Sequence, residues 1–521
     1  MNTGAILRVF FGLLTTAMTC AGAPLPNIVY IIADDLGYGD VQCLNPQRGR
    51  IPTPAIDRLA REGMTFTDAH GGSSVCTPTR YGVLTGRYAW RTRLQKGVLD
   101  DYVTPLIAQD RLTVPALLKQ HGYRTACVGK WHLGFTVDGG KSGKKGKGDL
   151  AGAPVGARTE DGPVSRGFDH FFGFHHARMM KSLFVDDRVA ELVEPVDMLP
   201  RLAGHAAEYV RASTSNTQHP TANIQAGGGP FFLYLALNSP HTPIVPSKEW
   251  QGRSGLGDYG DFVMQTDAAV GGVLDALDRT GAASNTLVIF TSDNGCSPAA
   301  GIDKLEKQGH FPSARFRGAK ADIWDGGHRI PFIVRWPGVV AAGSTNGGLV
   351  CLTDLMATCA ELVGAKLPDN AGEDSVSLLP ALGAGRNVEH RTSSTEHPTT
   401  DPTANSQHPT ANSQHPTTNS QRGTRNPERG TTATPPHGHT ATPSDALPAP
   451  GARPPVVHHS ISGHFAIRDG RWKLCLCAGS GGWSKGGGAE SPQLYDMAAD
   501  ATETNNVAAA YPEGVARLTG V

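Results

Sequence analysis

Short, continuous runs of apolar residues recur along the first two thirds of the chain, each bounded by Gly, Pro, Asp or Asn. The five clearest runs are 27–33 (NIVYIIA), 125–128 (TACV), 231–237 (FFLYLAL), 286–291 (TLVIFT) and 332–335 (FIVR). Apolar residues at nearly every position, instead of at alternate ones, are typical of strands that are covered on both faces. The pattern therefore predicts a sheet with helices packed against each side.

The segments between these runs have the spacing of helices. Residues 53–60 begin with Thr53 and Pro54, a capping residue followed by a proline in the first turn. Residues 114–120 and 258–279 carry apolar residues at helical intervals, and Gly281 follows the second segment as a stop signal. Strands that alternate with helices indicate an α/β domain with a large, central, mostly parallel sheet.

Two stretches lie outside this pattern. Residues 1–23 combine Arg8, a short apolar run and the sequence AGA, which is typical of an export signal. Residues 391–455 contain near-repeats of TANSQHP and almost no large apolar residue, so we expect a disordered insertion. We therefore predict a periplasmic or secreted protein with a catalytic domain at 24–390. Strand patterns return at 456–521, where we expect a small α+β subdomain.

The charge balance limits the kinds of partner. Lys and Arg together number 47, as do Asp and Glu, so the formal net charge of the 521 residues is zero. The lack of a field of one sign argues against nucleic acid as a main partner. No segment is long and apolar enough to cross a membrane. A small anionic substrate stays compatible with these numbers, because a pocket can be locally basic on a neutral protein.

Polar side chains follow directly after four of the predicted strands. They are Asp34 and Asp35, Lys130 and His132, His241, and Asp293 and Asn294. The carboxyl ends of parallel strands meet at one edge of a sheet, where open α/β folds bind their ligands. Three carboxylates in one place require a compensating cation, and oxygen ligands suit Ca²⁺ or Mg²⁺ better than zinc. A single Asp after a strand is more often a turn former, but two such pairs together favour a metal site.

Two motifs add a candidate nucleophile. Residues 76–80 read CTPTR, which matches C-x-P-x-R, and LTG follows at 84–86; a second segment runs from GYRT at 122–125 to GKWH at 129–132. Alone, Cys76 would be interpreted as a small buried apolar residue. With both motifs at this spacing, the sequence resembles the type I, formylglycine-dependent sulfatases of the alkaline phosphatase superfamily, which include the arylsulfatases. The resemblance extends from Asn27 to Leu518 apart from the low-complexity insertions.

The resemblance implies a role for each candidate residue. Cys76 would be oxidised to formylglycine (3-oxoalanine) by a formylglycine-generating enzyme, and Arg80 would steady the hydrate of this aldehyde. Calcium, or else magnesium, would be held by Asp34, Asp35, Asp293, Asn294 and an oxygen of the modified Cys76. The groups that contact sulfate or move protons would be Lys130, His132, His241 and Lys320. Ala319 departs from the family pattern, in which a glycine often precedes the last lysine.

The predicted function is the hydrolysis of a sulfate ester, with release of inorganic sulfate. The substrate would be an aryl sulfate or a sulfated carbohydrate, either a small molecule or a polysaccharide. Two alternatives stay open: a phosphonate monoester or phosphodiester hydrolase that uses the same modified residue, and an inactive, calcium-dependent glycan-binding protein. Four other histidines near the motifs could enter the pocket, but a solvated loop position is the default expectation for each; they are His175, His176, His310 and His328.

Overall fold

The computed structural model describes residues 24–139, 152–215, 229–384, 453–485 and 490–520. The expected export signal at 1–23 and all but the last three residues of the expected insertion at 391–455 lie outside the described residues. No helix within the described ranges combines the length and the apolar character that a membrane span requires.

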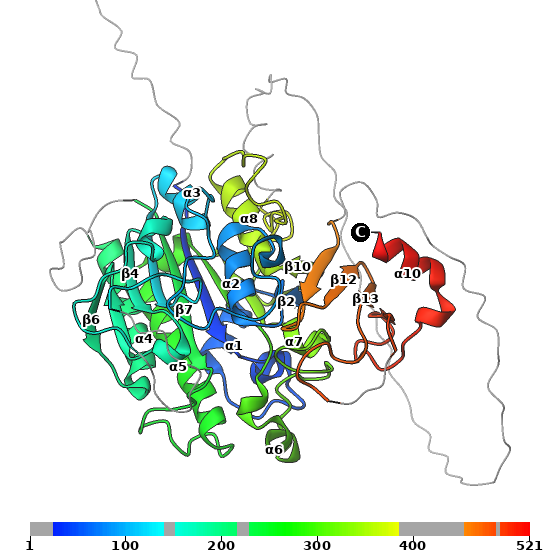
Figure 1. Cartoon of the computed structure of the whole chain (residues 1–521). Helices are drawn as coiled ribbons and strands as arrows, with labels where there is room; N and C mark the ends of the chain where they lie inside the picture. The colour runs from blue at the N-terminus through cyan, green and yellow to red at the C-terminus, as the bar shows by residue number, and fades with distance from the viewer. Residues whose placement is uncertain (1–23, 140–151, 216–228, 385–452, 486–489, 521) are drawn as a thin grey trace, which may run out of the picture. The chain divides into compact units, whose positions relative to one another are not determined.

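The centre of the main domain is a ten-stranded sheet (Figure 1). Its strands, in spatial order, are β10 (Ser344–Cys351), β2 (Met64–His70), β9 (Phe332–Arg335), β8 (Thr286–Ser292), β1 (Asn27–Asp34), β7 (Phe231–Pro240), β3 (Arg124–Lys130), β4 (His170–Phe174), β5 (Ser182–Val185) and β6 (Arg188–Leu192). The run β8-β1-β7-β3-β4 is parallel throughout, whereas β9, β5 and β6 pair antiparallel with their neighbours. This order confirms the predicted large and mostly parallel sheet.

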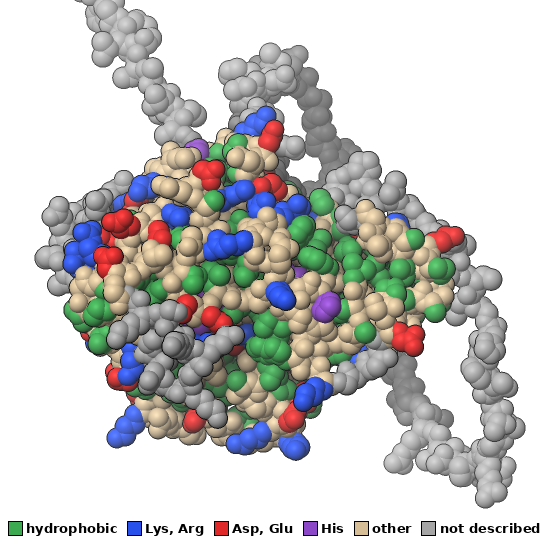
Figure 2. Space-filling view, in the orientation of Figure 1, with side chains coloured by type: hydrophobic (Ala, Val, Ile, Leu, Met, Phe, Trp, Pro, Cys, Tyr) green, Lys and Arg blue, Asp and Glu red, His purple; other side chains and the backbone are tan. Residues whose placement is uncertain are grey.

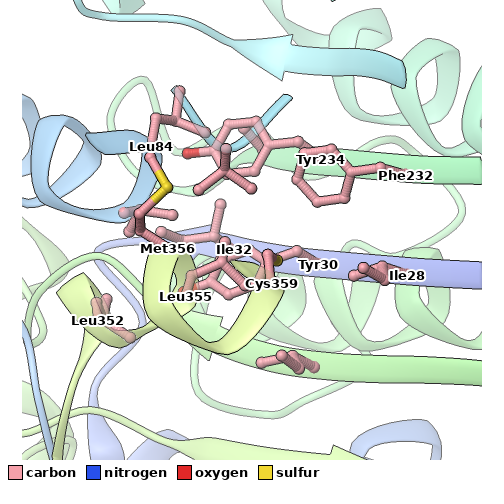
Figure 3. Close-up of a cluster of buried hydrophobic side chains, with 14 of the residues drawn as sticks. Ile28, Tyr30, Ile32, Leu84, Phe232, Tyr234, Leu352, Leu355, Met356 and Cys359 are labelled. Atoms are coloured by element: carbon pink, nitrogen blue, oxygen red, sulfur yellow. The ribbon is translucent and has the colours of Figure 1, made fainter. Parts of the chain in front are cut away.

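Helices cover both faces of the sheet. Alternate side chains of β1 therefore enter two different cores, one on each face. Ile28, Tyr30 and Ile32 belong to the first core, which includes α2 (Cys76–Thr85), α3 (Val114–Gln120) and α8 (Leu355–Leu362). Figure 3 shows this core, in which Tyr30 lies near Cys359 of α8. Val29 and Ile31 belong to the second core, with α1 (Pro54–Glu62), α4 (Pro195–Thr214) and α5 (Asp258–Arg279). Two short helices, α6 (Ile302–Lys307) and α7 (Asp325–His328), follow β8.

A second, antiparallel sheet lies near the C-terminus. Its strands are β11 (Val456–His459), β12 (Phe465–Asp469), β13 (Trp472–Cys475) and β14 (Gln493–Asp496). One face packs on Leu518 of α10 (Pro512–Thr519), and the other packs on Ile323 and Trp324 of the main domain. The expected small α+β unit is therefore confirmed.

A buried polar network joins the small sheet to the main domain. The Lys473 ammonium group of β13 donates to Asp325 Oδ1 at 2.8 Å and lies 2.7 Å from Glu503 Oε1. It also lies 3.1 Å from His328 Nε2, and His328 Nδ1 lies 3.0 Å from His70 Nδ1. All of these side chains are fully buried, so each charge depends on its partners instead of on water.

Two histidines that were expected in solvated loops are buried, so that expectation is wrong. His328 belongs to the network just described, and His310 is fully buried beside Asp40. His310 Nδ1 accepts from the backbone N–H of Arg50, so its Nε2–H donates to Asp40 Oδ1 at 2.8 Å. Neither position has an apolar periodicity around it, and only tertiary partners distant in sequence reveal the burial.

The distribution of charged side chains on the surface agrees with the formal net charge of zero. Figure 2 shows basic and acidic side chains interspersed over the face that it draws, without a broad area of one sign. This distribution fits the expectation that positive charge needed for an anionic substrate is confined to a pocket.

Candidate active site

The ends of four neighbouring parallel strands bring the predicted polar residues together. Asp34 ends β1 and Asp35 follows it, Asp293 and Asn294 follow β8, and Lys130 ends β3. His241 follows β7, which lies between β1 and β3. Four of these side chains are almost completely buried: Asp34, Asp35, Asp293 and Lys130. The convergence that the sequence pattern predicted is therefore present in the fold.

Three carboxylates in this site face three cations. Arg80 donates from Nε and Nη2 to Asp293 Oδ2, at 3.0 and 2.8 Å. Lys130 Nζ donates to Asp34 Oδ2 at 2.7 Å, and Lys320 Nζ lies 2.5 Å from Asp35 Oδ1. Burial by itself would raise the pKa of Asp34, but Lys130 and the other cations around it hold that pKa well below its ordinary value. The pocket thus keeps the Asp34 carboxylate ionised deep inside the protein.

Two oxygen atoms at this site have no hydrogen-bond partner among the described residues. They are Asp34 Oδ1 and Asn294 Oδ1, both buried. Ligand atoms of Asp34, Cys76 and Asp293 lie within 4.8 Å of one another, and so do those of Asp34, Asp35 and His241. Asp34 Oδ1 makes no hydrogen bond but lies 3.6 Å from Arg80 Nη2. Buried oxygen atoms without a hydrogen bond are what a hard divalent cation needs, so the residues present fit a calcium or magnesium ion.

Cys76 is the first residue of α2 and is 3 % exposed. Burial raises the pKa of its thiol, although Lys130 and Lys320 act in the opposite direction. A reactive cysteine normally has a lowered pKa, because the thiolate is the nucleophile. The unmodified thiol therefore stays protonated and is a weak nucleophile, although it lies at the centre of the site beside Asp34 and Asp293.

The backbone around the site is held in unusual conformations. Asp35, His132 and Ala321, which follows Lys320, have φ values of 67°, 57° and 81°, in the left-handed region that favours glycine. Such conformations cost free energy and tend to persist where function requires them. Close packing of β3 on β7 also matters here, because a Cβ atom at Gly129 would lie 1.8 Å from the carbonyl oxygen of Ala236. The backbone of β3 therefore lies directly against β7 at the residue before Lys130.

Two histidines offer proton-transfer groups with different hydrogen bonds. His132 Nε2 donates to the Leu99 carbonyl oxygen at 2.8 Å, while its Nδ1 is buried and has no partner among the described residues. Burial holds the pKa of His132 well below its ordinary value, so the ring is neutral and Nδ1 can accept a proton. His241 Nδ1 donates to the Thr242 carbonyl oxygen at 2.6 Å, and its Nε2 lies 3.7 Å from Asp35 Oδ2.

Sequence reasoning missed two further histidines of the site. His175 and His176 were expected in a solvated loop, but they are 0 % and 6 % exposed, so the expectation is wrong. Both follow β4, the parallel neighbour of β3, and the ring centroids of His176 and His132 are 4.3 Å apart. The rule that polar residues follow parallel strands would have found them, had the strand HFFGF at 170–174 been recognised.

Comparisons with known proteins agree with this geometry. The family model described as Sulfatase matches residues 26–365. The N-acetylgalactosamine-6-O-sulfatase of Bacteroides thetaiotaomicron is 29% identical over 95% of this chain and 92% of its own length. Arylsulfatase A of Bos taurus is 34% identical over 72% of each chain. A solved structure from a study of glycosaminoglycan metabolism by Bacteroides thetaiotaomicron has a TM-score of 0.70 and 26% identity, covering 95% of this chain and 98% of that one. The chain therefore belongs to the sulfatase family, among the type I sulfatases of the alkaline phosphatase superfamily, and is a sulfuric ester hydrolase.

Proposed function

We propose that this protein hydrolyses the sulfate ester of a sulfated sugar, using a formylglycine hydrate made from Cys76 and a bound calcium ion. The observation that carries the proposal is the position of Cys76, within 4.8 Å of carboxylate oxygens of Asp34 and Asp293 in a buried, cation-rich pocket. Export of the chain and oxidation of Cys76 by a formylglycine-generating enzyme are parts of the same proposal.

Asp34, Asp35, Asp293 and Asn294 would hold the ion, with magnesium as the alternative to calcium. When bound, the ion lowers the pKa of a nearby hydroxyl group and offsets negative charge on the sulfuryl oxygens. The fit is supported by the two unpartnered oxygens and by a ligand set that contains only oxygen atoms from Asp and Asn side chains. The three carboxylates are already balanced by three cations, so a divalent ion would make the pocket positive, as an anionic substrate requires.

The hydrated aldehyde at position 76 supplies an attacking hydroxyl group and, through its second hydroxyl, a route by which sulfate is released. Arg80 would orient this group, since two hydrogen bonds from its guanidinium to Asp293 Oδ2 fix its position. Lys130 and Lys320 are buried ammonium groups beside Asp34 and Asp35, and they would stabilise charge on the sulfuryl oxygens.

His241 and His132 would move the protons. Burial lowers the pKa of His241 below its ordinary value, although Asp34 and Asp35 act in the opposite direction. The Nε2 atom lies 3.7 Å from Asp35 Oδ2, and when it carries a proton it can donate that proton to the leaving alcohol. The Nδ1 atom of His132 carries a free lone pair in the neutral ring, so it can accept the proton that sulfate release requires. The two histidines would thus serve opposite steps.

The substrate proposal uses the names of the relatives. The relative from Bacteroides thetaiotaomicron that covers nearly the whole chain is an N-acetylgalactosamine-6-O-sulfatase, and the Rattus norvegicus N-acetylgalactosamine-6-sulfatase is 32% identical over 71% of this chain. N-acetylgalactosamine 6-sulfate is therefore the first compound to test.

The test is a substrate panel on protein co-expressed with a formylglycine-generating enzyme. The panel contains N-acetylgalactosamine 6-sulfate, glucosamine 6-sulfate, 4-nitrophenyl sulfate and bis(4-nitrophenyl) phosphate, with peptide mass spectrometry of residue 76. We expect the highest kcat/KM on a sulfated sugar and a loss of turnover in Cys76→Ala and in the matched variant Cys76→Ser. Retained turnover in both variants would discard the nucleophile. A higher kcat/KM on the phosphodiester would favour the alternative hydrolase, and an unmodified, inactive protein would favour a glycan-binding role.

A further inference from the structure

One residue of a loop, Leu99, links the helix that begins with Cys76 to His132. The backbone N–H of Leu99 donates to Thr77 Oγ1 at 3.2 Å, and its carbonyl oxygen accepts from His132 Nε2 at 2.8 Å. Thr77 follows Cys76 in α2 and is fully buried, and His132 is 1 % exposed. Leu99 thus connects the neighbour of the proposed nucleophile with the proposed acceptor of the proton that sulfate release requires.

The carbonyl oxygen of Leu99 determines which nitrogen of His132 can accept a proton. A carbonyl oxygen only accepts hydrogen bonds, so the ring carries its hydrogen on Nε2 and keeps a lone pair on the buried Nδ1. The backbone of His132 is held separately, because its N–H donates to the carbonyl oxygen of His175 at 2.7 Å. The ring can still rotate or exchange its tautomer, and the contact with Leu99 restricts both changes.

Thr77 is the side chain that holds the middle of this loop. The loop has other attachments on both sides of Leu99: the N–H of Gly97 donates to the carbonyl oxygen of Ile461 at 2.8 Å, and Asp100 belongs to an exposed ion pair. Neither attachment involves the N–H or the carbonyl oxygen of Leu99. A variant without the Thr77 hydroxyl should therefore keep the loop in place and loosen only the residue that contacts His132.

We propose that Thr77 is a positioning residue, whose hydroxyl oxygen holds Leu99 so that the Leu99 carbonyl oxygen keeps His132 in the tautomer that accepts a proton on Nδ1. This inference rests on the proposed function, in which sulfate is released after the alcohol has left. In that step His132 takes the proton of the second hydroxyl at residue 76, the aldehyde C=O bond forms, and the carbon–oxygen bond to sulfate breaks. Sulfate leaves with the electrons of that bond.

The first test uses the unmodified chain, in which residue 76 is still cysteine, so it does not depend on turnover. In Thr77→Val the Leu99 N–H loses its acceptor, whereas Thr77→Ser keeps one. Hydrogen exchange at Leu99, followed by mass spectrometry of overlapping peptides, should be about 5-fold faster in Thr77→Val, as expected for one lost hydrogen bond. NMR of isotope-labelled histidine rings, assigned with His132→Gln, should show a smaller population of the Nε2–H tautomer of His132.

The second test separates the two halves of the reaction on modified protein, with each rate divided by the modified fraction that mass spectrometry gives. Quenched-flow sampling on the best substrate of the panel follows release of the alcohol and release of sulfate separately. We expect Thr77→Val to slow sulfate release by about 10-fold, because part of the base catalysis is lost, and to slow alcohol release by less than about 3-fold. Thr77→Ser should recover most of the rate of sulfate release.

Thr79→Val is the matched control. Thr79 lies in the same helix and is equally buried, but its hydroxyl donates to the carbonyl oxygen of Ser73 at 3.0 Å and does not contact the loop of Leu99. This variant should leave hydrogen exchange at Leu99 and the ratio of the two release rates as in the wild type.

An unchanged His132 tautomer in Thr77→Val would overturn the inference, and so would equal rates of sulfate release in this variant and the wild type. Equal slowing of both releases would overturn it as well, because Thr77 would then have only a structural role. Failure of the proposed function is a distinct outcome, since it would appear in the modified wild type as a lack of turnover on every sulfate ester.

Discussion

Replacing Lys473 with methionine should destabilise the protein strongly, because the ammonium group is the shared partner of two buried carboxylates. Lys473 donates to Asp325 Oδ1 at 2.8 Å and lies 2.7 Å from Glu503 Oε1, and all three side chains are fully buried. Asp325 would keep its contact with Arg329 at 2.7 Å in the variant. Glu503 would lose its ammonium partner and would keep the contact of its Oε2 with the Asp325 N–H.

The expected loss of stability in Lys473→Met follows from the free energy that is lost when a buried ion pair is broken. Removing one partner of such a pair costs about 3–5 kcal/mol, since the remaining charge has no water to replace it. For a protein of this size the entropy of unfolding is on the order of 0.9 kcal/mol per kelvin, so Tm should fall by about 3–6 °C. The fall should be smaller at pH 6 than at pH 8, because Glu503 can take up a proton as the pH falls.

The measurement is thermal unfolding of Lys473→Met beside a matched variant, Arg471→Met. Arg471 lies next to the same strand and pairs with Asp496, but its side chain is 56% exposed. An exposed ion pair contributes about 0–1 kcal/mol, so the control should barely change Tm. If the two variants lowered Tm by the same amount, the buried network would not carry the stability that its geometry implies.

Three further predictions test other parts of the structure. Burial raises the pKa of Glu503 to about 7 from an ordinary value of 4.5, so the folded state binds a proton that the unfolded state releases in this range. The stability of the wild type should therefore fall as the pH rises from about 4.5 to 7. A series of Tm measurements against pH should show a smaller fall for Glu503→Gln. Chelation with EDTA should abolish sulfate release, and Ca²⁺ or Mg²⁺ should restore it while Zn²⁺ should not; recovery with zinc alone would contradict the oxygen-ligand site. Gly129→Ala should prevent soluble expression or lower Tm sharply, because its Cβ would lie 1.8 Å from the carbonyl oxygen of Ala236. Gly122 also has a positive φ but has nothing within 4 Å of a Cβ atom, so Gly122→Ala should lower Tm much less. Equal effects would show that backbone strain, and not the β3–β7 contact, determines the loss of stability.

Local patterns predicted the central elements of the fold well. The helices expected at 114–120 and 258–279 have the bounds of α3 and α5, and the strand expected at 27–33 is β1 with one residue added. These segments carry strong apolar periodicity, because each is buried against the central sheet. Strands β2 and β10 were missed, because their sequences, MTFTDAH and STNGGLVC, mix polar and apolar residues and are defined by pairing across more than 250 residues.

The site was predictable to the extent that its residues follow parallel strands. Asp34, Asp293 and His241 could be grouped from the sequence by that rule, whereas Cys76 and Lys320 were identified only through the resemblance to a known family. The contact of Arg80 with Asp293 joins residues 213 positions apart and has no local signal. His176 was missed for a related reason: the strand before it was not recognised, so nothing placed the histidine at the common edge.

The environment of Cys76 gives a physical reason for replacing its thiol. A thiolate at this position would need positive charge, yet the nearby ammonium groups of Lys130 and Lys320 already face Asp34 and Asp35, and burial raises the pKa of the thiol. Stronger local positive charge would lower that pKa, but fixed cations without the carboxylates would also bind the sulfate product tightly. The proposed hydroxyl group on an oxidised residue would avoid this conflict, because an ion held by the carboxylates would activate it. Burial, with a smaller contribution from the carboxylates, makes the Cys76 thiol a weak nucleophile, whereas the same carboxylates would hold the ion that the proposed modified form requires.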